Sequence, residues 1–163
     1  MKRPLILGLL MCFLICCFAG CSGVSARDPL CYQVYPLTAE GELTWHGGVF
    51  GVKLEIEESG RGTLYFLSPE RVSGLRMAVS EEGVILSHGE RQIQLSEDSP
   101  LCPAVVSLVR AFSITDRSAL TYTKDGFVYN GMTYVCDSQN GYPLSVAGNA
   151  FSFRITLYTP GGN

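Results

Sequence analysis

The sequence predicts a mainly β (α+β) fold: a strongly curved antiparallel sheet or half-barrel of about ten strands, with one helix over residues 100–112 packed on its concave face. Two observations lead to this prediction. Residues 51–57 alternate apolar and charged side chains, which is typical of a strand with one dry face and one solvated face. Residues 101–112 instead place their apolar side chains at helical spacing.

Six strands are expected before this helix. In the second of them, Val52, Leu54 and Ile56 share one face. The third, residues 63–67, has apolar residues at both parities, which favours a central place in the sheet. The six segments, separated by turns rich in Gly, Pro and Glu, are 34–46, 51–57, 63–67, 75–79, 84–87 and 92–95.

Residues 100–112 form the one expected helix. Ser99 precedes Pro100, an order that resembles an N-cap followed by a proline in the first turn, where a missing N–H matters little. The stripe expected to cover the sheet consists of Leu101, Val105, Leu108, Val109 and Phe112.

Further strands are expected after the helix. Asn130-Gly131 is the strongest short hairpin signal and joins two of them. The last strand should present a one-sided apolar face made of Phe151, Phe153, Ile155 and Leu157. The segments are 119–123, 127–129, 132–136, 143–147 and 151–157.

Residues 1–20 have the organisation of a secretory signal peptide. Lys2 and Arg3 precede an apolar run over residues 5–19, which is short for a membrane-spanning helix of about 20 apolar residues. The run ends in Phe18-Ala19-Gly20-Cys21, which resembles the lipobox of bacterial lipoproteins, although Phe18 stands where that family usually has Leu. The resemblance implies that the Cys21 thiol takes a diacylglyceryl group and that cleavage makes Cys21 the first residue. Two acyl chains anchor a protein stably, whereas one holds only marginally.

Two alternatives stay open at this leader. Val24-Ser25-Ala26 also resembles a small-residue cleavage site, and cleavage there would discard Cys21 and release the protein. An uncleaved leader would itself anchor the chain. With lipid on Cys21, the chain divides into a signal peptide over 1–20, a tether over 21–31 and a single β-rich domain over 32–160.

Composition and charge exclude several classes of protein. Hydrophobic residues make up 47% of the chain and charged residues 17%, which argues against disorder. Without Lys2 and Arg3, the 12 basic residues fall to 10 against 15 acidic ones, so the net charge is about −5. No basic run follows the leader, and nucleic acid is therefore not an expected partner. An acidic domain is also not drawn to an anionic membrane surface, so attachment must come from the lipid.

Over residues 34–158 the order of features resembles the lipoprotein carriers of the LolA/LolB-like type. The resemblance lies in an early long hairpin, the run Leu64-Tyr65-Phe66-Leu67-Ser68-Pro69-Glu70, the central helix, and the turn Asp137-Ser138-Gln139-Asn140-Gly141-Tyr142-Pro143 before a final strand. It implies a half-open β-barrel closed by helices that holds acyl chains inside. Members of that family usually have more than one helix, whereas only one is marked here.

The residues that could carry chemistry do not converge in the sequence. No nucleophile elbow, zinc-protease motif, P-loop or dinucleotide fingerprint occurs, and His46 and His88 each lie beside glycine in expected turns. Cys31, Cys102 and Cys136 do not have the spacing of zinc ligands. Two interpretations of these cysteines stay open. Either two of the three form a disulfide, or Cys102 and Cys136 are small buried residues. We expect no catalytic residue, no cofactor and no metal site.

The sequence therefore leads to two main hypotheses about function. The first is a membrane-anchored lipoprotein on the extracytoplasmic face of the cell membrane, with a non-catalytic binding or scaffold role and an envelope protein as partner. The second is a LolA/LolB-like carrier or chaperone for lipid, acyl chains or another hydrophobic ligand. A small envelope hydrolase is a third, less favoured reading. An open apolar cavity between the helix and the sheet would support the carrier; a filled core would support the binding protein.

Overall fold

The computed structural model describes residues 28–96 and 98–161. The predicted signal peptide, Cys21 and most of the predicted tether lie outside these residues. Within the described part, no helix combines the length and the apolar character that crossing a membrane needs.

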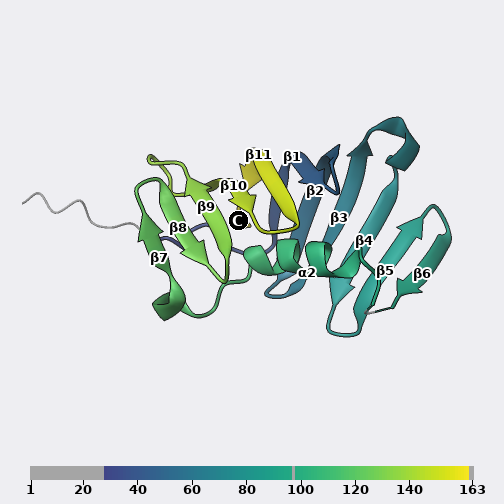
Figure 1. Cartoon of the computed structure of the whole chain (residues 1–163), viewed down its shortest axis with the longest axis horizontal. Helices are drawn as coiled ribbons and strands as arrows, with labels where there is room; N and C mark the ends of the chain where they lie inside the picture. The colour runs from purple at the N-terminus through teal and green to yellow at the C-terminus, as the bar shows by residue number, and fades with distance from the viewer. Residues whose placement is uncertain (1–27, 97, 162–163) are drawn as a thin grey trace, which may run out of the picture.

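Over these residues, eleven antiparallel strands form one sheet, and one α-helix, α2 (Cys102–Ala111), lies across it (Figure 1). The predictions of a mainly β antiparallel fold and of a single α-helix are confirmed for the described residues. Two short 3₁₀ helices, η1 (Glu70–Val72) and η2 (Arg117–Ala119), lie in connections. The strands are β1 (Leu37–Trp45), β2 (Gly48–Glu58), β3 (Arg61–Ser68), β4 (Leu75–Ser80), β5 (Gly83–His88), β6 (Arg91–Leu95), β7 (Thr121–Thr123), β8 (Gly126–Tyr129), β9 (Met132–Cys136), β10 (Pro143–Ala147) and β11 (Phe151–Thr159).

The sheet is built from two meanders that meet at its centre. Strands β1 to β6 follow one another, strands β7 to β11 do the same, and β11 then pairs with β1. The strands β6 and β7 are consequently the two edges, and the sheet is not closed. Figure 1 shows these edges at opposite ends of the long axis. The strong curvature expected from the sequence stays a prediction.

One face of the sheet and one side of α2 form the core. The strand alternation puts every second residue on this face, as in Val52, Leu54 and Ile56 of β2, which are fully buried. The helix contributes Cys102, Ala104, Val105, Leu108, Val109 and Ala111. These residues recur at helical spacing and together form the buried side of α2.

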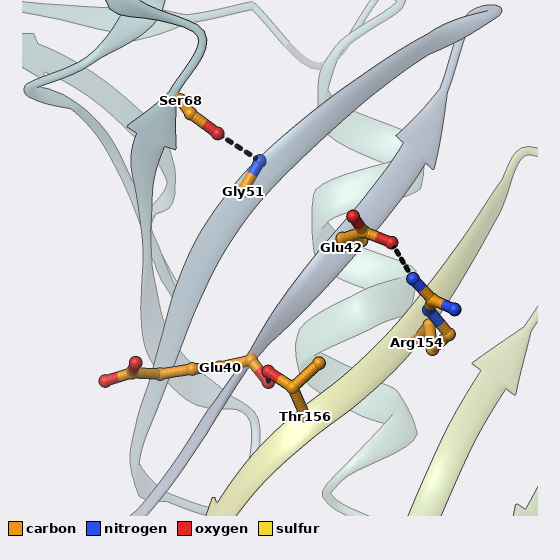
Figure 2. A network of polar contacts seen from close by, with 6 residues as sticks. All are labelled: Glu40, Glu42, Gly51, Ser68, Arg154 and Thr156. Carbon is orange, nitrogen blue, oxygen red and sulfur yellow. Dashed lines mark hydrogen bonds and ion pairs between the residues drawn. The ribbon is translucent and has the colours of Figure 1, made fainter.

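The opposite face of the sheet is polar (Figure 2). At its centre Arg154 of β11 forms an ion pair with Glu42 of β1, and the hydroxyl of Thr156 donates to the carbonyl oxygen of Glu40 at 3.2 Å. The register between β1 and β11 shifts between Glu40 and Gly41. A Cβ at Gly41 would lie 1.9 Å from the carbonyl oxygen of Arg154, so only glycine fits here.

This bulge makes one prediction wrong. Ile155 pairs with Gly41 while Leu157 pairs with Glu40, so Thr156 is an extra residue on β11. The extra residue inverts the alternation, and Leu157 lies on the polar face with 55% of its surface exposed. Leu157 is therefore not part of the apolar face expected with Phe151, Phe153 and Ile155.

Several element boundaries also differ from the prediction, and two of these differences have a local cause. Helix α2 begins at Cys102, with Leu101 at the N-cap position and no side-chain cap. Ser99 instead closes a turn before the helix: its hydroxyl accepts from the N–H of Leu101 at 3.4 Å and its carbonyl from the N–H of Cys102 at 3.1 Å.

The strand expected over 119–123 is shorter. The carboxylate of Asp116 accepts from the N–H of Ser118 at 2.9 Å, and this local bond favours η2 over an extended chain. Only Thr121–Thr123 remains as β7.

Candidate functional site

The C-terminal end of helix α2 is held by tyrosine hydroxyls. The last carbonyls of a helix lack partners within it. The hydroxyls of Tyr32 and Tyr134 donate to the carbonyl oxygen of Ala111 at 3.4 and 3.0 Å, and Tyr35 donates to that of Phe112 at 2.6 Å. Residues distant in sequence therefore fix where the helix ends on the sheet.

Burial raises the pKa of Tyr32, and it also raises the pKa of Tyr134. A neighbouring tyrosine adds to each shift, Tyr134 for the first and Tyr129 for the second. Both hydroxyls thus stay protonated at neutral pH and remain able to donate.

Core side chains fill the space between the helix and the sheet. Val105, Leu108 and Val109 of α2 are at most 1% exposed, and so are Leu64 and Met77 on the strands beneath. A cavity wide enough for water would leave accessible surface on its walls. No such surface exists at these five side chains, so the helix packs directly on the sheet there.

Two open hollows flank the helix. The first has a volume of about 530 Å³ and lies between α2 and the turns at 129–132 and 148–151. The second has a volume of about 840 Å³ and lies between α2 and residues 79–84. Both include Ser59, Gly60, Pro103 and Arg110. Their volumes fall within the roughly 300–1,000 Å³ that is usual for ligand sites.

The turn between β2 and β3 is pinned to the helix where the hollows meet. The N–H of Gly60 donates to the hydroxyl of Ser113 at 2.8 Å, and that hydroxyl donates to the carbonyl of Val109 at 3.3 Å. Beside this turn, Arg61 forms ion pairs with Glu57 at 3.4 Å and Glu58 at 3.2 Å. The bond to Ser113 holds Gly60, which lines both hollows, against the end of the helix.

The walls of the two hollows mix polar and apolar groups. The first presents hydroxyls and amides beside Met132 and Phe151; its polar members are Ser59, Ser107, Arg110, Ser113, Tyr129, Asn130 and Asn149. The second combines an apolar strip with acids; its members include Val79, Val84, Leu95, Val106, Glu58, Glu81 and Glu82. Such walls suit a polar or amphipathic partner, because a purely apolar ligand would leave their polar groups unpaired.

The residues singled out in the sequence are dispersed. His46 lies in the β1–β2 turn at φ +49°, with its ring 5.4 Å from that of Trp45. His88 ends β5. Neither histidine lines the two hollows, whereas Glu81 and Glu82, in the turn between β4 and β5, do line the second. The signal that was missed is that four separate turns converge on α2, which no local pattern reveals.

The described cysteines differ in burial. Cys102 is buried and its thiol lies 3.4 Å from the carbonyl oxygen of Ser96, as the reading of a small buried residue predicts. Cys31 and Cys136 are only half-buried, so the same reading is wrong for Cys136. Over residues 28–96 and 98–161, no group of three or more His, Cys, Asp or Glu side chains is arranged to hold a metal ion. The predicted lipid site, Cys21, lies outside the described residues.

Most of the aromatic residues belong to the core. Trp45, Phe66, Phe127, Tyr134, Phe151 and Phe153 are buried. Phe127 and Tyr134 stack with ring centroids 4.4 Å apart, and Tyr129 and Phe151 also line the first hollow. Of the aromatic residues just named, only this last pair therefore combines a place in the sheet with access to the candidate site.

No family model and no curated protein matches the chain.

Proposed function

We propose that this chain is a bacterial lipoprotein, anchored through lipid on Cys21 to the extracytoplasmic face of the cell membrane, and that its folded part binds an envelope protein without catalysing a reaction. The apolar leader and the segment Phe18-Ala19-Gly20-Cys21 support the anchor. The tether enters the domain beside η2, where Asp28 forms an ion pair with Arg117 at 2.8 Å.

The observation that carries the binding role is the contrast between the two sides of helix α2. On the inner side, Val105, Leu108 and Val109 are buried against the sheet. On the outer side, Ser107 and Arg110 border open hollows of mixed polarity. A partner that docks from outside can use these groups, since a non-obligate interface is about as polar as the rest of a protein surface.

The anchor is tested by replacing its thiol. In a bacterium that makes the full chain with its own leader, Cys21→Ala should abolish labelling by radioactive palmitate and leave an uncleaved precursor. Cys17→Ala, in the same leader, is the matched control and should be labelled and processed normally. A Cys21→Ala chain that is processed and retained as before would contradict the anchor.

The binding role is tested by site-specific photo-crosslinking in the same cells. A photoreactive amino acid at Ser107 or Val106 should give one discrete conjugate with an envelope protein. The same probe at Thr44, an exposed residue on the polar face of β1, should not. Equal conjugates from all three sites, or none from the helix, would argue against binding at the hollows.

A carrier of the LolA/LolB-like type is the second candidate. The apolar strip of Val79, Val84, Leu95 and Val106 in the second hollow favours it, because a strongly curved sheet with the helix on its concave face could extend this strip into a lipid site. Native mass spectrometry of gently extracted protein should then show a bound lipid that Val106→Arg removes. If the measured mass corresponds to the protein and its own lipid anchor, with no additional bound lipid, the carrier is excluded.

A further inference from the structure

Cys31 lies in a segment that the core holds firmly. Its neighbour Tyr32 is fully buried, and the hydroxyl of Tyr32 donates to the carbonyl of Ala111 at the end of α2. The hydroxyl of Tyr158 on β11 donates to the carbonyl oxygen of Tyr32. The N–H of Cys31 donates to the carbonyl of Asp28 at 3.0 Å. The position of Cys31 is therefore set by the helix and β11 together.

The sulfur of Cys31 packs on the loop that follows β9. It lies 3.5 Å from the carbonyl oxygen of Asn140, and a Cβ added at Gly141 would come within 3.0 Å of it. This loop folds back on itself: the N–H of Gly141 donates to the carbonyl of Asp137, and the N–H of Asp137 to the carbonyl of Tyr142, both at 2.8 Å. The residues against Cys31 are thus held beside Asp137, which directly follows Cys136.

Cys136 ends β9 and points to the same side of the sheet as Tyr134, two residues earlier. The hydroxyls of Tyr134 and Tyr32 share one acceptor, the carbonyl of Ala111. Cys31 precedes Tyr32 in the sequence, and Cys136 lies two residues after Tyr134. Both cysteines are therefore close in sequence to tyrosines that bind the same carbonyl oxygen. Burial, and next the charge of nearby Cys31, raise the pKa of Cys136 to about 11.

We propose that Cys31 and Cys136 are a redox-active pair that forms a disulfide when the folded chain meets a thiol oxidant. Cys102 is not a competing partner, because it starts α2 while both tyrosine bonds are at the other end of this helix, about 15 Å away. The bond would fasten the end of the predicted tether to the C-terminal half of the sheet. The extracytoplasmic location proposed above supplies the oxidising conditions in which such bonds persist.

The chemistry is thiol–disulfide exchange with a disulfide oxidant, R–S–S–R. One cysteine thiolate attacks the oxidant and releases R–S⁻, and the second attacks the mixed disulfide and releases the other R–S⁻. Two cysteine thiols are oxidised, the oxidant is reduced to two R–SH, and the two cysteine protons end on these leaving groups. Because little Cys136 thiolate exists at neutral pH, the rate should rise with pH between 7 and 10.

The test uses the full chain, purified in detergent, reduced, and then incubated folded with oxidised glutathione. Remaining thiols are alkylated, and tryptic peptides are mapped without reduction. We expect peptide 28–53 linked to peptide 125–154 with the loss of two hydrogens, and Cys102 alkylated in peptide 92–110. In urea this selectivity should disappear, since the unfolded chain does not hold the pair together.

Matched variants complete the test. Cys31→Ser and Cys136→Ser should each abolish the link, and Cys102→Ser should leave its yield unchanged. Alkylation of both Cys31 and Cys136 in the folded oxidised chain, a separate glutathione on each, or an equal yield of links to Cys102 or to a leader cysteine would overturn the proposal. The outcome depends neither on where the protein resides nor on what the hollows bind, so a failure here would leave the proposed function standing.

Discussion

Replacing Tyr134 and Tyr32 by phenylalanine, singly and together, tests how the end of helix α2 is held. Phenylalanine keeps the ring, so the stacking of Tyr134 on Phe127 is retained and only the hydroxyl is lost. A neutral hydrogen bond contributes about 1 kcal/mol to stability. In either single variant the carbonyl of Ala111 still accepts from the other tyrosine, so Tyr134→Phe should cost about 1 kcal/mol and Tyr32→Phe, whose bond is longer at 3.4 Å, somewhat less.

The double variant should cost more than the sum of the two. Ala111 is fully buried, and without both hydroxyls its carbonyl oxygen loses its tyrosine donors inside the core. An unsatisfied buried acceptor costs roughly 1–3 kcal/mol, so we expect a total near 3 kcal/mol and a coupling of about 1 kcal/mol. Additive costs would refute the idea that the two hydroxyls support one carbonyl.

Urea unfolding followed by tryptophan fluorescence measures these values. Trp45 is the only tryptophan in the chain and is buried on β1, so its emission should change as the sheet unfolds. Tyr122→Phe is the matched control, because this tyrosine is 67% exposed on the edge strand β7. Its unfolding midpoint should stay within the effect of an ordinary surface substitution, about 0.5 kcal/mol.

Three further predictions concern packing and pH. Gly41→Ala should destabilise the chain by about 3 kcal/mol or more, because the added Cβ would lie 1.9 Å from a carbonyl oxygen of β11. Gly47 has a φ of +74° and open space around it, so Gly47→Ala should cost only about 1–2 kcal/mol in the same urea assay. Leu108→Ala should cost about 2–5 kcal/mol by leaving a cavity under the helix, and Ser107→Ala on the outer side of the same turn should change the midpoint by less than about 0.5 kcal/mol. Burial raises the pKa of Tyr134 in the folded chain. The contribution of this tyrosine to folding stability is therefore fully present below its unfolded pKa of about 10 and is lost as the pH rises above that value. The urea midpoint of the native chain should fall at alkaline pH, and the midpoint of Tyr134→Phe should fall less.

Local patterns predicted most of the strands but not how they pair. The alternation of Val52, Leu54 and Ile56 depends only on the two-residue repeat of a strand, and the structure keeps it. The exposure of Leu157 depends on a bulge opposite Glu40, more than a hundred residues away in the chain. A pattern read along one strand cannot contain that information, because the shift arises only when β11 meets β1.

The candidate site was still less accessible from the sequence. The hollows exist because turns near residues 59, 82, 130 and 149 surround one helix, and each turn looks like an ordinary hairpin by itself. The same holds for the shared bond to Ala111, whose donors come from residues 32 and 134. Composition and leader predict where the chain goes, but the groups that could bind a partner depend on tertiary pairing.

The edges of the sheet bear on which surface serves for binding. An open edge offers unpaired N–H and C=O groups to any passing strand, and proteins protect it with short strands or with charged and polar residues. The edge strand β7 has only three residues, Thr121–Thr123, and β6 carries Arg91, Gln92 and Gln94 around a single exposed apolar residue, Ile93. Both edges are thus guarded against strand addition. The hollows beside α2 have no such protection. Their lining includes the turn held by the Gly60–Ser113 bond and both polar and apolar side chains, which favours the hollows over the edges as the surface for the proposed partner.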